Sequence, residues 1–179
     1  MTYYTPDVTE DMVFTAVVGF LNLILPGLGT DHIIQGQGNR TPPPPEPEYI
    51  LVTPAGRVRL AQNSEAWDFS DPANGATDTS QSTQFAVDVE VHGDSSGDTA
   101  QLITTVFRSD YAVTSFPSNV TPLYCDDPQQ LVFQDAEAQA ENRWQFKMFL
   151  QITPTVSTPQ QSANTLGVKI APPADSGAP

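Results

Sequence analysis

The chain has few basic residues: seven Lys and Arg stand against 21 Asp and Glu in 179 residues, which gives a net charge of −14. Such an acidic surface repels nucleic-acid phosphates and anionic lipids, and the basic stripe that marks a nucleic-acid reader is missing. The composition therefore argues against stable binding to DNA. It is still compatible with a protein that lies close to DNA without binding it.

Cysteine is nearly absent as well. Cys125 is the only one, so neither an intrachain disulfide nor a cysteine-based metal cluster can form, and this usage favours a reducing compartment. The first ten residues contain two acids and no Lys or Arg, and thus lack the basic start of a signal peptide. Met12–Leu25 is apolar but shorter than the ~20 residues of a membrane span. We expect a soluble protein without a membrane partner.

Two helices are predicted. The first starts at Thr5–Asp7, where a capping residue, a first-turn proline and an acidic side chain coincide, and it ends at Pro26. Apolar residues recur every four positions within it, and others lie elsewhere on its surface. We therefore expect it to be nearly enclosed, by its own sheet or by a neighbouring subunit. The second helix starts within Asp94–Asp98 and runs to about Phe107 or Tyr111.

Alternating β-branched and aromatic residues predict the strands. The two clearest are Gln84–Val91 and Asn142–Ile152, and the first has one apolar face and one wet, acidic face. Tyr49–Thr53 and Arg57–Leu60 flank turn residues at 54–56 and are predicted to form a hairpin. Short strands are expected at His32–Gln35, Gln130–Phe133 and Leu166–Ile170.

The order of these elements predicts an α+β fold: a mostly antiparallel β-sheet with the N-terminal helix and the second helix packed on one face, long loops and a C-terminal arm. We expect one domain over residues 1–170, with inserted loops at about 36–48 and 61–81, and a flexible tail at 171–179. The first loop is proline-rich and predicts an extended connector. The second is polar, with Trp67 and Phe69 as its large side chains. Such a loop is expected to be functional or to order against a partner.

Cys125 is the first candidate for a catalytic residue. Asp126 and Asp127 beside it would raise the pKa of its thiol, so a packed thiol is preferred over a nucleophile with His32 or His92 as its base. The aspartates lack the spacing of a calcium loop, although a weakly held structural ion stays an alternative, and the glycine pairs lack the context of a phosphate loop. We expect no catalytic, metal or cofactor-binding residues, hence no enzyme.

The scarce cations are more informative. One interpretation is intramolecular pairing that relieves self-repulsion. Since exposed pairs contribute little, the other is that some cations meet acidic edges of neighbouring subunits. The candidate interface residues are the arginines and the two large side chains of the second loop: Arg40, Arg57, Arg59, Trp67, Phe69, Arg108 and Arg143.

Several short stretches, in this order along the chain, are similar to motifs of one known family. They are Ile34–Arg40 followed by the prolines, Gln81–Gln84, Phe107–Ala112, Pro122–Pro128, Glu141–Trp144 and Pro154–Val156 with Pro159–Gln160. Each stretch is weak alone, but their order and spacing are specific. From about Val8 to Val168 the chain resembles the phage neck terminator (tail terminator) family, the head-to-tail joining proteins of tailed bacteriophages.

The resemblance implies a structural virion protein, made in the host cytoplasm, that forms a ring, expected to be a hexamer. Its implied partners are itself, neck connector or collar proteins, the tail tube and the sheath, with DNA only as passing cargo. A DNA channel should avoid tight phosphate binding, and the acidic candidates for its wall are Asp68, Asp71, Asp78, Asp88 and Glu90. The alternative is a tail-assembly chaperone or adaptor that forms no ring.

Overall fold

The computed structural model describes residues 4–36, 48–68, 70, 75–134 and 140–160. Its helices are α1 (Glu10–Ile24), the short 3-10 helix η1 (Thr30–His32), α2 (Ser96–Phe107) and α3 (Asp110–Ser115). Its strands are β1 (Ile33–Gln35), β2 (Tyr49–Arg59), β3 (Ser64–Asp68), β4 (Ala76–Ser80), β5 (Thr83–His92), β6 (Val120–Cys125), β7 (Gln129–Gln134), β8 (Ala140–Ile152) and β9 (Thr155–Pro159).

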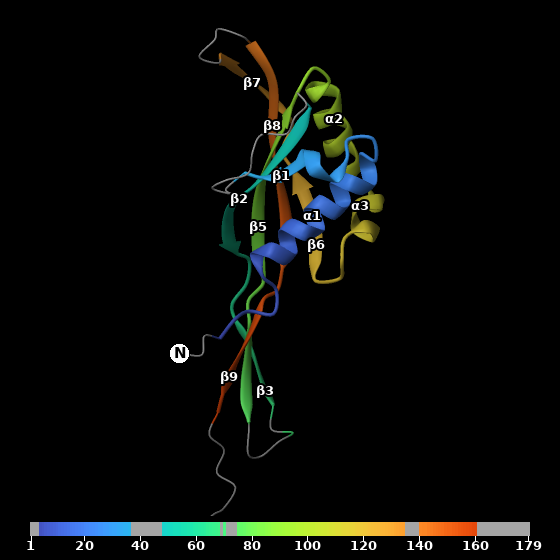
Figure 1. Ribbon diagram of the computed structural model, residues 1–179. Helices are drawn as coiled ribbons and strands as arrows, with labels where there is room; N and C mark the ends of the chain where they lie inside the picture. The colour runs from blue at the N-terminus through green and yellow to red at the C-terminus, as the bar shows by residue number, and fades with distance from the viewer. Residues whose placement is uncertain (1–3, 37–47, 69, 71–74, 135–139, 161–179) are drawn as a thin grey trace, which may run out of the picture.

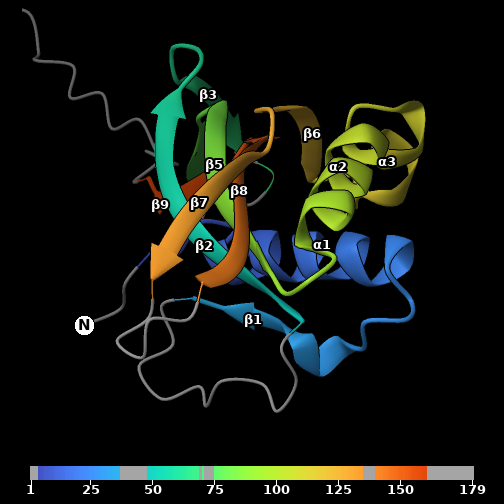
Figure 2. The same ribbon diagram turned by 90° about the horizontal axis from the view of Figure 1, so that it is seen from above.

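Six strands form the main sheet, in the order β1-β2-β5-β8-β6, with β7 also paired to β8. Only the β1–β2 pair is parallel. The three α-helices lie on the same side of this sheet (Figures 1 and 2). The predicted α+β class, with a mostly antiparallel sheet covered by helices on one face, is confirmed.

The core fills the space between the main sheet and the helices. Alternate residues of β5 point into it, and Val89 is fully buried there. Val17 of α1 and Ile103 of α2 are fully buried on the opposite side. The alternation predicted for Gln84–Val91 is thus confirmed, because a strand with one covered face needs an apolar side chain at every second position. None of the helices in the described part of the chain lies on the opposite face of the sheet, which we call the open face (Figure 2).

The start of the first helix was predicted too early. Thr9 is the N-cap, with its Oγ1 accepting a hydrogen bond from the Met12 N–H at 3.4 Å. Asp7 has another role: its N–H donates to the Thr155 carbonyl at 3.1 Å, and its Oδ1 accepts from the Thr155 N–H at 2.6 Å. The segment before α1 is therefore tied to β9. Helix α1 is also less enclosed than expected, because Leu23 is 54% exposed.

The predicted hairpin at residues 49–60 is wrong, because β2 is one long strand. The expected turn is a bulge, a register shift between Pro54 and Gly56 against β5. Pairing with β1 ends at Val52, and from there on no described strand pairs with the outer side of β2. A proline at such an edge forfeits no ladder hydrogen bond. The turn residues therefore bend the strand without ending it.

The prediction of a loop at residues 61–81 also differs from the structure. This segment supplies β3 and β4, which join β9 in a second, three-stranded sheet that projects from the body (Figure 1). We call this sheet, residues 64–68, 76–80 and 155–159, the ribbon. Its order β3-β4-β9 continues the order β2-β5-β8 of the main sheet across residues 60–63, 81–82 and 153–154. Local sequence could not predict it, because β4 pairs with residues far along the chain.

The remaining predicted segments have mixed outcomes. The second helix ends at Phe107 as predicted, but β6 and α3 were not predicted. The proline-rich connector at residues 37–47, the strand expected at Leu166–Ile170 and the tail at 171–179 lie outside the described residues. Within the described part, no helix is long and apolar enough to cross a membrane.

Candidate subunit interface

Cys125 lies in a buried position at the end of β6. Its Sγ–H donates to the Thr104 carbonyl at 3.7 Å, and burial raises the pKa of its thiol, with Asp126 and Asp127 adding to the effect and Arg108 opposing it. The direction agrees with the sequence argument, although burial is the largest cause. A thiol held protonated in this way is a poor nucleophile.

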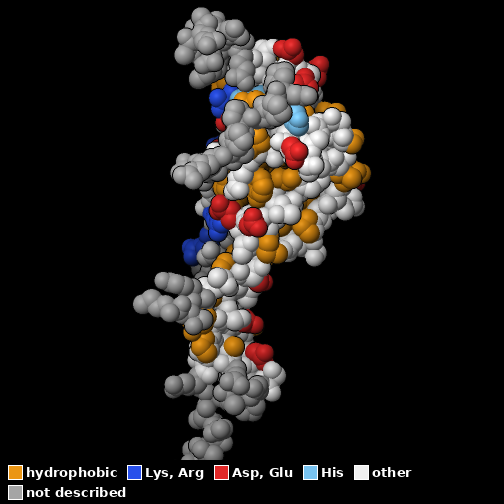
Figure 3. Space-filling model, viewed as in Figure 1, with side chains coloured by type: hydrophobic (Ala, Val, Ile, Leu, Met, Phe, Trp, Pro, Cys, Tyr) orange, Lys and Arg blue, Asp and Glu red, His pale blue; other side chains and the backbone are white. Residues whose placement is uncertain are grey.

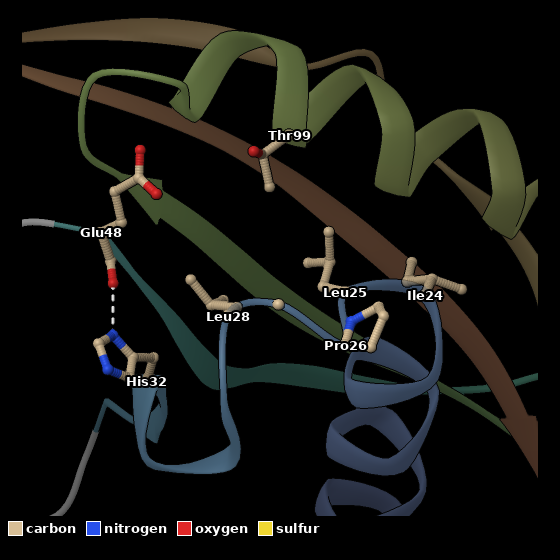
Figure 4. Close-up of a pocket in the computed structure, with 8 residues that line it drawn as sticks. Ile24, Leu25, Pro26, Leu28, His32, Glu48 and Thr99 are labelled. Carbon is tan, nitrogen blue, oxygen red and sulfur yellow. Dashed lines mark hydrogen bonds between the residues drawn. The ribbon is translucent and has the colours of Figure 1, made fainter.

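The two histidines are engaged elsewhere. His32 Nδ1 lies 2.7 Å from the Glu48 carbonyl oxygen, inside a hollow between the loop after α1 and helix α2 (Figure 4). Leu25 and Leu28 line the same hollow, and the Glu48 carboxylate accepts a hydrogen bond from the Ser95 hydroxyl at 2.7 Å. His32 Nδ1 and the Glu48 carboxylate are thus already engaged by protein atoms. Among the described residues no group of three His, Cys, Asp or Glu could hold a metal ion.

Most of the cations are paired inside the subunit. Four of the five Lys and Arg in the described part of the chain form ion pairs. The pairs are Arg57 with Glu10 (3.0 Å), Arg108 with Asp127 (2.7 Å), Arg143 with Glu90 (2.5 Å) and Lys147 with Asp88 (3.8 Å). The exception is Arg59, for which no acidic partner is found among the described residues. Of the two interpretations left open by the sequence, intramolecular pairing thus accounts for four cations.

The acidic stripe predicted on β5 is neutralised on the open face. Asp88 and Glu90 lie opposite Lys147 and Gln145 of β8, and each carboxylate meets a cation. The His92 imidazole, whose Nε2 lies 3.7 Å from Glu90 Oε2, and then the contact with Arg143 lower the pKa of Glu90 against the opposing effect of burial. Each of these two carboxylates is therefore balanced by a cation of β8.

The ribbon holds the other described acidic candidates. Asp68 is exposed at the end of β3, and hydrogen bonds from Ser70 lower its pKa. Asp78 of β4 accepts a hydrogen bond from the Ser157 hydroxyl. Arg40, Phe69 and Asp71 lie outside the described residues.

Three sequence candidates lie near one another in the chain, where β2 leads into the ribbon. Arg57 and Arg59 end β2, and Trp67 of β3 is 59% exposed. Val58 (61% exposed) and Leu60 (47% exposed) alternate with these arginines and point to the other face of the strand. We call residues 57–60 the β2 tip. Neither of these two apolar residues was a candidate from the sequence, since alternation does not reveal that β2 extends beyond the part of the sheet that the helices cover. Arg108 and Arg143 are not part of this surface.

In Figure 3 the blue Lys and Arg atoms lie along one edge of the molecule, and the red carboxylates are spread over the visible face and the ribbon. A main sheet with one open face, a projecting ribbon and an exposed apolar strand end are features of a subunit that makes contacts with other proteins. The fold and surface thus define an assembly module of the α+β class.

A comparison with family models identifies the family. The model described as phage neck terminator protein matches residues 11–173, most of the chain. The chain belongs to this family of structural phage neck proteins. No curated protein matches the chain.

Proposed function

We propose that identical copies of this chain form a closed ring, a hexamer, at the phage neck. The ring ends the tail tube, joins it to the portal side through connector or collar proteins, contacts tube and sheath, and leaves a channel through which DNA passes. The family supports a neck role, and the ring is our extension of it. The alternative is an adaptor or chaperone that stays monomeric.

The ribbon is the observation that carries this proposal. All five residues of β3 are exposed, and Thr77 is the one buried residue among the fifteen of the three ribbon strands. A small sheet gains stability mainly by burying one face against another layer. The ribbon has no such layer among the described residues. Contacts with another subunit or with a neck partner would provide it, and Trp67 offers a large apolar surface for them.

The charge of the chain fits a DNA channel. A net charge of −14 per copy, multiplied around a ring, repels phosphates and disfavours tight binding of the passing duplex. Asp68 and Asp78 of the ribbon are the better candidates for the channel wall. Asp88 and Glu90 contribute less, because Lys147 and Arg143 neutralise them.

Native mass spectrometry and light scattering test this function on the purified chain, alone and with tail tubes. We expect a closed ring in at least one condition, and tubes that stop growing when it binds. Trp67→Gln should weaken ring formation. Leu23→Gln, which removes an apolar side chain of similar exposure from α1, is the matched control. A chain that stays monomeric with tubes present would favour the adaptor instead.

A further inference from the structure

Arg59 is a cation for which the described part of this acidic chain offers no acidic partner. It ends β2, on the sheet edge that β1 leaves free. Exposed Val58 and Leu60 flank it. Because side chains alternate along a strand, Val58 and Leu60 point to the other face. The exposed Arg59 guanidinium is thus available to a polar hollow with a carboxylate.

Such a hollow exists at the opposite side of the same sheet. It is lined by residues of the segment before α1, the turn before β6, β6 itself and the end of β8: Asp7, Ser118, Asn119, Thr121, Gln151 and Thr153. The Asp7 carboxylate is exposed and accepts one hydrogen bond, from the Thr155 N–H. A carboxylate offers about four acceptor positions, so an arginine can still bind it through both oxygens.

The two sites lie at the same level of the sheet. Arg59 pairs with Thr83 of β5, Thr83 with Ile152 of β8, and Ile152 with Val120 of β6. One row across the sheet therefore runs from Arg59 at one edge to the border of the hollow at the other. A closed ring requires two different, complementary patches on opposite sides of each subunit.

The same two edges are poorly suited to direct strand pairing between copies. The Val52 carbonyl accepts a hydrogen bond from the Gly36 N–H on the outer side of β2, and Pro54, two residues on, faces the same way without a donor. On β6 the Val120 N–H donates to the Pro117 carbonyl, away from β8, and Pro122 follows two residues on. Prolines and bulges at both edges hinder edge-to-edge association. Side chains must then make the contact.

We propose that Arg59 of one copy docks into the Asp7 hollow of the next copy, which makes this ion pair the repeating contact of the ring. The proposal rests on the proposed function, which supplies the ring. Arg59 and Asp7 are both exposed in the single subunit, and neither is in an ion pair with another described residue, so docking breaks no such pair.

Charge reversal with complementation by mixing tests this contact. Arg59→Glu and Asp7→Arg should each weaken ring formation by about tenfold or more, since each places like charges together. The double variant should restore the ring. An equal mixture of the two single variants should also restore it, because in an alternating ring every contact then joins opposite charges. Rings are counted by native mass spectrometry, alone and with tail tubes.

Controls separate this contact from general charge effects and from misfolding. Asp31→Arg makes the same charge change as Asp7→Arg at an exposed site on η1, and should leave ring formation unchanged. Asp7→Asn keeps an acceptor for the Thr155 N–H but loses the charge, so it should weaken the ring without lowering the melting temperature. Circular dichroism of each variant should match that of the unmodified chain.

The outcomes distinguish the contact from the function. If the unmodified chain forms rings and the two single variants do so equally well, the contact is wrong and the proposed function stands. If both singles lose the ring but neither the double variant nor the mixture recovers it, the contact is wrong as well. If the unmodified chain forms no ring in any condition, both proposals are overturned.

Discussion

At the residue scale, the cluster around Glu90 shows how the open face holds charges within a sheet. Tyr49 stacks on His92, with ring centroids 4.2 Å apart, and Arg143 reaches Glu90 from the next strand. Each polar group is placed by the cross-strand register, in which Tyr49 pairs with His92 and His92 with Arg143. The cluster therefore depends on three strands being in register.

The lowered pKa of Glu90 predicts that this cluster is sensitive to acid. A carboxylate whose pKa falls on folding stabilises the native state above its ordinary pKa of about 4.3, and this contribution is lost as the pH drops through the lowered value. The free energy of unfolding, from urea titrations at pH 3 to 7, should therefore show an advantage of the unmodified chain over Glu90→Gln at neutral pH. That advantage should shrink below about pH 4.5. A difference that is constant with pH would contradict the assignment.

The sequence supports only part of this residue-level description. The alternation of Asn142–Ile152 suffices to predict that Arg143 and Lys147 share a face of β8, because side chains alternate along a strand. It cannot predict their partners Glu90 and Asp88, since these depend on which strand lies next to β8 and in which register. That Arg59 finds no acidic partner among the described residues depends on the same information.

At the element scale, residues 54–56 of β2 show how a correct sequence signal can lead to a wrong prediction: the turn residues are real, but they form a bulge and not a hairpin turn. Turn residues in a chain predict a reversal of direction, but here they sit on a free edge and insert one extra residue opposite β5. The ribbon is harder still to predict, because its strands are short and polar and bury only one residue, Thr77. Their polarity resembles that of a loop, and only the pairing of β4 with β9 reveals the sheet.

Deleting Ala55 tests the bulge. It removes the extra residue and leaves the pairs on both sides in register, so the domain should fold with a melting temperature within a few degrees of the unmodified chain. Deleting Ala86 of β5, which pairs with Gly56 beside the bulge and regularly with Phe149 of β8, should instead put one part of β5 on the wrong face relative to β8 and abolish cooperative unfolding. Thermal melts followed by circular dichroism distinguish the two. Equal damage from both deletions would mean that the bulge residue is needed for folding.

At the scale of the whole molecule, net charge and assembly oppose each other. Each copy carries a net charge of −14, and closing a ring brings these net negative subunits together. The internal ion pairs do not relieve this repulsion, because they leave the net charge unchanged. The contacts that join the copies must therefore overcome an electrostatic repulsion between subunits, and this repulsion is screened by salt.

Association between copies should therefore strengthen as salt is added. The screening length falls from about 30 Å at 10 mM salt to about 10 Å at 100 mM. This removes more repulsion between whole subunits than it removes attraction within a single Arg59–Asp7 contact. Sedimentation at about 10 mM and about 300 mM NaCl should show the larger species at the higher concentration. Dissociation by salt would mean that local ion pairs dominate the interface.

The continuity between main sheet and ribbon has a mechanical consequence. The chain passes from β4 into β5 and from β8 into β9 with only two residues between the strands of each pair. A pull on the ribbon along its strands is therefore transmitted directly into the two central strands of the body. Their many hydrogen bonds share that tension in shear instead of opening one after another, which makes the body a firm anchor for whatever the ribbon grips.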